Sequence, residues 1–204
     1  MPGDARSRVT DRAASRSGFS HRPPGSGPGD CENARVQRVR PARHDDAAEV
    51  AGVHVRSWQV GYRGLLPDDY LDGLRPEDRM DRYTFGATGP DLPSTLVAVN
   101  DGAICGFVTT GPSRDADVAG AGEVLALYVD PHAWGLGVGR RLMARAREQL
   151  GRRGFSTGVL WVLSGNDRAQ HFYRADGWAI DGHQRSAEVW NIAVDEVRFS
   201  RRLP

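Results

Sequence analysis

The 204-residue chain contains no lysine, because all 27 of its basic side chains are arginine. This absence excludes chemistry that needs a lysine amine, such as a pyridoxal-phosphate Schiff base or the phosphate-binding lysine of a P-loop. Cysteine is nearly absent as well, with only Cys31 and Cys105, and no pair of histidines lies near either. A disulfide between them is geometrically possible. Their separation instead favours a reduced, cytoplasmic protein without a metal site.

Long apolar runs are also missing. No stretch approaches the roughly 18 consecutive apolar residues that a membrane-spanning helix needs, and the first residues lack the apolar segment of a secretory signal. The length suits one well-buried domain, and 39% hydrophobic residues are typical of a soluble globular protein. We therefore expect no membrane partner.

Residues 1–34 differ in composition from the rest of the chain. Nineteen of the first thirty residues are Gly, Pro, Ser or Arg. Such a segment cannot bury enough surface to offset its ordering entropy, so we predict a disordered tail and an ordered domain over residues 35–204. Five Arg against three Asp make the first thirty residues only weakly basic, and the remainder has 22 Arg against 23 acidic residues. A nucleic-acid partner is therefore not expected.

Hydrophobic periodicity predicts an α/β protein in which an antiparallel hairpin leads into a partly parallel centre. An Asp-Gly pair at 101–102 between two apolar runs indicates the hairpin. Asp45 or Asp46 is the expected cap of the first helix. Strands are predicted near 35–42, 94–99, 103–110, 123–130, 155–163, 178–185 and 194–202, and helices from 47 onward, after Pro67, after Pro76, from 138 to about 152, and over 166–177.

The stretch 128-YVDPHAWGLGVGRRLM-143 sets three glycines between a predicted strand and a predicted helix. A dinucleotide fingerprint is excluded, because the sixth position counted from Gly135 is Arg140 and not glycine. Backbone N–H groups at such a helix start, together with the helix dipole, can hold a pyrophosphate. Side chains at Gly135, Gly137 or Gly139 would block its approach. The alternative is that the glycines only form a tight strand–helix turn.

Two blocks of sequence, Trp134-Gly135-Leu136-Gly137-Val138-Gly139 and Asn166, Ala169, Phe172-Tyr173, Gly177-Trp178, resemble the motifs of the Gcn5-related N-acetyltransferase (GNAT) superfamily over about residues 35–203. Trp134 replaces the Gln or Arg that is usual in the family. The resemblance implies a mixed, mostly antiparallel sheet that is splayed between its central strands and flanked by helices.

The resemblance also implies which residues form the site. Glu123 would be the base that deprotonates the incoming amine, unless it is a solvent-exposed residue at the start of a strand. Tyr173 would donate to the leaving thiolate, unless it only packs in the core. Trp58 and Tyr62 would line the acceptor site, although core packing alone also explains Trp58. The co-substrate acetyl-CoA would be bound by Leu127, Tyr128, Val129, Trp134, Gly135, Leu136, Gly137, Val138, Gly139, Arg140 and Asn166.

The function implied is transfer of an acetyl group from acetyl-CoA to a primary amine, by direct attack in a ternary complex and without a metal. The alternative is a non-catalytic acyl-CoA-binding sensor with the same fold. The expected partners are acetyl-CoA and an amine acceptor, either a small molecule or a peptide N-terminus, and the chain could form a homodimer. The loops over 59–93, 111–122 and 186–193 carry no pattern that identifies the acceptor.

Overall fold

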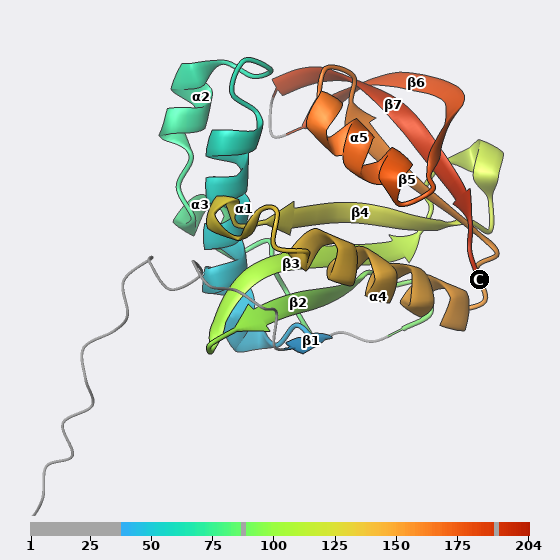
Figure 1. Ribbon diagram of the computed structural model, residues 1–204, viewed down its shortest axis with the longest axis horizontal. Coiled ribbons are helices and arrows are strands. Elements are labelled where there is room, and N and C mark those ends of the chain that lie inside the picture. Colours follow the sequence, from blue (N-terminus) through green and yellow to red (C-terminus); the bar gives the residue numbers. More distant parts are fainter. Residues whose placement is uncertain (1–37, 87–88, 190–191) are drawn as a thin grey trace, which may run out of the picture.

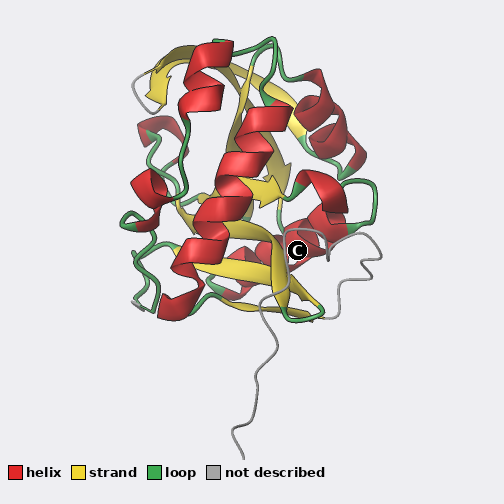
Figure 2. Ribbon diagram, turned by 90° about the vertical axis from the view of Figure 1, so that its left-hand side faces the viewer, coloured by secondary structure: helices red, strands yellow, loops and turns green. Residues whose placement is uncertain are grey.

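The computed structural model describes residues 38–86, 89–189 and 192–204. These residues form one seven-stranded sheet (Figure 1) with helices on both of its faces (Figure 2). The predicted disordered tail, residues 1–34, and the predicted start of the domain at residue 35 lie outside the described residues.

The helices and strands follow in the predicted order. The strands are β1 Arg38–Pro41, β2 Ser94–Asn100, β3 Ala103–Pro112, β4 Gly122–Val129, β5 Thr157–Leu163, β6 Ala179–Val189 and β7 Ile192–Arg202. The helices are α1 Ala47–Gly61, α2 Asp68–Gly73, α3 Glu77–Met80, α4 Val138–Arg152 and α5 Asp167–Ala175. β6 is longer than predicted, because it ends at Val189 and not near residue 185, and its pairing with β7 shifts register between Ile180 and Gln184.

The sheet has the strand order β1-β2-β3-β4-β5-β7-β6. Every neighbouring pair is antiparallel except β4 and β5, which are parallel. The parallel pair is very short, since only Gly122↔Gly158 and Glu123↔Val159 are in register. Beyond these residues β4 and β5 diverge (Figure 1). The prediction of a mixed, mostly antiparallel sheet that splays at its centre is confirmed.

Turn chemistry explains the register of the β2–β3 hairpin. Both Asp101 and Gly102 have positive φ angles, 46° and 87°. This conformation is typical of the two-residue turns that match the twist of paired strands. The turn sets Asn100 opposite Ala103 and Val99 opposite Ile104, and the register then shifts between Ala98 and Val99.

Each face of the sheet packs against a different set of helices. The predicted apolar stripe of α4 (Val138, Leu142, Ala146 and Leu150) is fully buried against one face, where side chains of α5 also pack. The helix α1 packs on the opposite face through Val50 and Val53. In Figure 1, α4 and α5 lie in front of the sheet and α1 lies behind it. The splayed strands β4 and β5 therefore open between these two layers.

The start of α1 differs from the prediction in one respect. Asp46 directly precedes the helix, but its side chain does not cap a helix N–H group. Its carboxylate instead accepts a hydrogen bond from the Arg43 backbone N–H at 2.6 Å and pairs with Arg40 at 2.6 Å. Asp46 thus joins α1 to β1.

Two further predictions concern membrane insertion and disulfides. Within the described ranges, no helix combines the length and apolar character needed to cross a membrane. Cys105 is buried and forms no disulfide within the described residues, and its thiol donates to the Ala98 carbonyl at 3.5 Å. Cys31 lies outside the described residues.

Candidate active site

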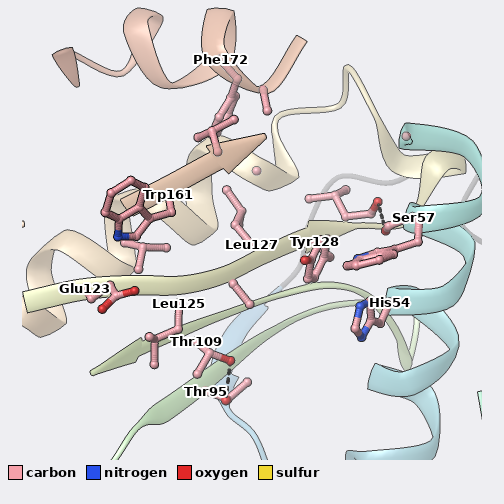
Figure 3. A pocket seen from close by; sticks show the side chains of 18 of the residues that line it. His54, Ser57, Thr95, Thr109, Glu123, Leu125, Leu127, Tyr128, Trp161 and Phe172 are labelled. Carbon is pink, nitrogen blue, oxygen red and sulfur yellow. Dashed lines mark hydrogen bonds between the residues drawn. The ribbon is translucent and has the colours of Figure 1, made fainter. Parts of the chain in front are cut away.

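A cavity of about 1130 Å³ opens where β4 and β5 diverge. Its walls are α1, the unpaired part of β4, the glycine-containing turn before α4, and α5. Figure 3 shows side chains from α1, β4, β5 and α5 converging on this space. Because the lining comes from both layers, the cavity can hold one ligand on each side of the split.

A β-bulge at Leu125 determines which side chains of β4 face each layer. Leu125 has no partner on β3, so the usual alternation of side chains is broken there. Val124 and Leu127 consequently both pack on the α4 side, although they are three positions apart. For the same reason, Glu123 and Tyr128 both face the α1 side and line the cavity.

Glu123 lies at the base of the split, in the last pair that joins β4 to β5. It is only 3% exposed, so it is not a solvent-exposed residue at the start of a strand. One carboxylate oxygen accepts from the Arg114 backbone N–H at 3.3 Å, and the other lies 3.6 Å from the Arg114 guanidinium group. A carboxylate in this position can accept a proton from a ligand in the cavity.

Glycine is required at the three positions of the turn for two different structural reasons. Gly135 and Gly137 have φ angles of 77° and 82°, which favour glycine, and a Cβ atom at either would meet nothing within 4 Å. Both line the cavity, so their backbone is open to a ligand. A Cβ atom at Gly139 would instead lie 3.3 Å from the Phe172 ring. This glycine allows α4 to approach α5. Since Gly139 also lines the cavity, the expectation that a side chain there would block a ligand stays a prediction.

The N-terminus of α4 faces the cavity. Its first N–H groups have no partner inside the helix, and Gly137, as the N-cap residue, offers no side chain to satisfy them. Val138 and Arg140 also line the cavity. Together the helix dipole and Arg140 make this end attractive to an anion. The Leu136 side chain, by contrast, is 44% exposed and does not line the cavity.

Trp134 has a structural role at the end of β4. Its indole N–H donates to the carbonyl of Val129 at 2.7 Å, and Ser57 donates to the same oxygen at 2.7 Å. The Trp134 ring stacks under the guanidinium group of Arg168, 3.1 Å from the ring centroid. Since the Val129 carbonyl already accepts two hydrogen bonds, only its N–H group remains for a ligand. Arg168 brings a second positive charge to the α5 side of the cavity.

Asn166 and Tyr173 line the cavity from α5. The Asn166 side-chain oxygen caps the helix by accepting from the Ala169 N–H at 3.0 Å, which leaves the amide N–H₂ group to face a ligand. Burial, followed by the nearby Tyr128, raises the pKa of Tyr173 well above its ordinary value. The Tyr173 hydroxyl therefore stays protonated and can donate a hydrogen bond in the cavity.

Aromatic side chains form the α1 wall. The His54 ring stacks on Tyr128, with centroids 4.7 Å apart, and its Nδ1 atom lies 2.6 Å from the Tyr83 hydroxyl. Burial lowers the pKa of His54 to about 3, so this histidine is neutral and a poor base. Trp58 is 3% exposed and packs with Tyr62, as core packing predicts, yet both rings also line the cavity.

Charged residues on β6 and β7 also line the cavity. Arg185 pairs with Glu196 at 2.8 Å and lies over the Trp161 ring, 4.1 Å from its centroid. The Trp161 indole N–H donates to Asp115 at 2.9 Å. These contacts tie the segment before β4 to the strands β5, β6 and β7.

A buried arginine stabilises this arrangement. Arg198 is 1% exposed and pairs with Asp115 at 3.2 Å, Asp117 at 2.6 Å and Asp181 at 2.7 Å. Hydrogen bonding to Arg198 lowers the pKa of Asp117, so the cluster is charged at neutral pH. It holds the loop that carries Arg114 against the end of the sheet.

The structure brings nearly all predicted site residues to one cavity. The predicted residues that line it are Trp58, Tyr62, Glu123, Leu127, Tyr128, Val129, Trp134, Gly135, Gly137, Val138, Gly139, Arg140, Asn166 and Tyr173. Sequence reasoning missed His54, Tyr83, Trp161, Arg168, Arg185 and Glu196. Alternation along the predicted strands could have indicated Trp161, whereas no local pattern indicated the others. No group of three or more His, Cys, Asp or Glu in the described ranges could hold a metal ion.

Comparison with known proteins gives one consistent result. The model of the acetyltransferase (GNAT) family matches residues 58–178. An uncharacterized N-acetyltransferase of Bacillus subtilis, YuaI, is 33% identical over 129 residues, which are 63% of this chain and 72% of that protein. An uncharacterized N-acetyltransferase of Archaeoglobus fulgidus is 33% identical over 66% of this chain and 88% of its own length.

The fold is shared with solved structures at lower identity. The PaiA N-acetyltransferase of Thermoplasma acidophilum, solved in complex with coenzyme A, matches with a TM-score of 0.60 and 18% sequence identity. The match covers 81% of this chain and 98% of that one.

Proposed function

The chain belongs to the acetyltransferase (GNAT) family, and from this premise we propose that it transfers an acetyl group from acetyl-CoA to a primary amine. One observation carries the proposal. The split between β4 and β5 opens at one end onto the N-terminus of α4 and has Glu123 at its base and Tyr173 on the opposite wall. An acyl donor and an amine can therefore meet inside the sheet.

The residues of the turn fit the pyrophosphate of acetyl-CoA. Gly135 and Gly137 leave open space in front of their backbone, and the N–H groups at the start of α4 face the same space. Arg140 and Arg168 add positive charge on this side of the cavity. Backbone N–H groups, a helix dipole and two guanidinium groups suit a doubly charged phosphate ligand.

The unpaired edge of β4 and the side chain of Asn166 would hold the pantetheine arm. Beyond Glu123, β4 has no described strand partner on its β5 side, so the backbone of Leu127 and the N–H group of Val129, which point away from β3, can bond an extended ligand. Asn166 presents its free amide group from the other wall. A backbone N–H near Leu127 would also polarise the carbonyl of the thioester.

Glu123 is placed to prepare the amine. A primary ammonium group must lose a proton before its nitrogen can attack, and the Glu123 carboxylate faces the α1 side of the cavity, where the acceptor would bind. The amine nitrogen then bonds to the thioester carbonyl carbon, the carbon–sulfur bond breaks, and the thiolate takes the electron pair. The second proton of the amine leaves to solvent, the thiolate takes up a proton from solvent, and the products are an amide and a free thiol.

Tyr173 would stabilise the leaving thiolate. A thiol has an ordinary pKa of about 8.5, below that of a tyrosine, and burial raises the pKa of Tyr173 further. Complete proton transfer from Tyr173 is therefore unfavourable. A hydrogen bond from its hydroxyl group still lowers the energy of the developing sulfur anion. The position of Tyr173 in the cavity lining is consistent with this role.

Thiol release from acetyl-CoA over a panel of amines tests the function, with acetyl-CoA binding measured in parallel by calorimetry. The proposal predicts binding and amine-dependent thiol release. Binding without release for any amine would support the alternative, a non-catalytic acyl-CoA sensor. Absence of binding would refute both.

A further inference from the structure

We propose that the acceptor is an α-amino-acid-type amine, whose carboxylate on the neighbouring carbon is bound by Arg114 while its amine faces Glu123. This inference rests on the proposed acetyl transfer and adds the substrate class. The residues that carry it are on the α1 side of the split, away from the turn and α4.

The first observation is the distance between two opposite charges. The Arg114 guanidinium group lies 3.6 Å from the Glu123 carboxylate, which is too long for a hydrogen bond, and the Arg114 side chain is 75% exposed. Within the described ranges, Arg114 forms an ion pair with Glu123 alone. An exposed guanidinium group that makes no hydrogen bond to Glu123 keeps several N–H donors for a ligand carboxylate.

The second observation is the geometric match to a zwitterion. In an α-amino acid the amine nitrogen and the carboxyl carbon are two bonds, about 2.5 Å, apart. One small molecule can therefore place its ammonium group at Glu123 and its carboxylate at Arg114, so that each charge meets its opposite. An amine without the carboxylate would leave Arg114 to repel its positive charge.

The third observation is the charge balance of this side of the cavity. The described charged residues that line it are three arginines (Arg82, Arg114 and Arg185) and two glutamates (Glu123 and Glu196). Glu196 is already paired with Arg185 at 2.8 Å. Only Glu123 remains for a cationic group, so the lining is unfavourable for a polyamine or another polycation and favourable for an amine that also carries an anion.

The surroundings leave room for an uncharged substituent. Leu125, Thr109 and Trp161 line the cavity beside Glu123 (Figure 3). Thr109 is satisfied by Thr95, since their hydroxyl oxygens are 2.8 Å apart. The apolar and neutral character of this part of the lining suits an uncharged amino-acid side chain.

The test compares amines that differ only in the carboxylate. Phenylalanine is paired with 2-phenylethylamine, and leucine with isoamylamine, and spermidine represents a polycation; kcat/KM is measured for each by thiol release. We expect each amino acid to exceed its decarboxylated partner by roughly tenfold, the effect of a charge-assisted hydrogen bond at a partly exposed site. We expect spermidine to be the poorest acceptor.

Arg114→Gln should reduce the preference for the amino acid over its partner amine to about twofold or less, and Arg114→Lys should restore part of it. Arg152→Gln is the matched control, because Arg152 is also exposed, at 61% of its side chain, but lies outside the cavity. This ratio is insensitive to a general loss of activity, which changes both members of a pair.

Equal or better turnover of the decarboxylated amines, or an Arg114→Gln variant with an unchanged ratio, would overturn the inference and leave the acetyltransferase function intact. Thiol release with none of the amines, although acetyl-CoA binds, would overturn the inference together with the proposed transfer. Failure to bind acetyl-CoA would refute the proposed function itself.

Discussion

Replacing Gly137 by alanine should greatly weaken acetyl-CoA binding at a small and calculable cost in stability. Gly137 has a φ angle of 82°, and a non-glycine residue in this region costs about 1–2 kcal/mol. The added methyl group meets no protein atom within 4 Å, so no packing penalty adds to this cost. For a domain of this size, the loss corresponds to a decrease in Tm of roughly 2–8 °C.

The effect on binding should be much larger than the effect on stability. The methyl group would occupy the space in front of the turn, where we propose that the pyrophosphate contacts backbone N–H groups. Loss of two charge-assisted hydrogen bonds, at about 1.5–3 kcal/mol each, weakens binding by at least about a hundredfold. The larger side chain of Gly137→Val should act in the same way, with greater backbone strain.

Gly154→Ala provides a matched control for this experiment. Gly154 has a φ angle of 88°, an added Cβ atom there also meets nothing within 4 Å, and the residue does not line the cavity. Both variants should lose similar stability in thermal denaturation, and only Gly137→Ala should lose affinity in calorimetry. If folded Gly137→Ala binds acetyl-CoA as tightly as Gly154→Ala, the assignment of the turn is refuted.

Four other variants test the remaining assignments. Glu123→Gln should lower the rate by about 10²–10⁴-fold, most steeply at acidic pH where the acceptor is protonated, with unchanged acetyl-CoA affinity; an unchanged pH–rate profile would exclude Glu123 as the base. Tyr173→Phe should slow turnover by roughly ten- to a thousandfold, and wild-type turnover under rate-limiting chemistry would assign Tyr173 to core packing. His54→Gln should reduce the loss of unfolding free energy that the wild type shows as the pH falls below 6.5. The buried His54 has a pKa of about 3, so between these pH values only the unfolded chain takes up this proton, and the wild type loses about 1.4 kcal/mol per pH unit. If the free energy of unfolding, measured with urea, falls equally with pH in the two proteins, this assignment is contradicted. Arg198→Leu leaves three aspartates without their shared partner and should cost about 3–5 kcal/mol in urea denaturation, whereas a loss below about 1 kcal/mol would show that the cluster is not needed for stability.

Local patterns were sufficient to predict most of the fold. The apolar stripe of α4 and the Asp101-Gly102 turn depend on residues that are close in sequence, and both were predicted correctly. The predicted length of β6 was wrong, because the strand reaches Val189 and not only residue 185. Its last residues pair with the start of β7, for example Glu188 with Ala193, and local periodicity did not indicate this contact.

The site was harder to predict, because part of it depends on contacts between distant segments. Strand alternation alone would place Glu123 and Tyr128, five positions apart, on opposite faces, and only the bulge at Leu125 brings them to the same side. The contact between His54 and Tyr83 joins α1 to a loop 29 positions later. The motif around Gly139 did not reveal one reason for this glycine, which is the close approach of the Phe172 ring.

A crystal structure with bound coenzyme A would test the central claim most directly. We predict the pyrophosphate at the N-terminus of α4, in front of Gly135 and Gly137, and the pantetheine arm between β4 and β5 with its sulfur near Tyr173. A coenzyme bound outside this split, or with its sulfur remote from both Glu123 and Tyr173, would contradict the account.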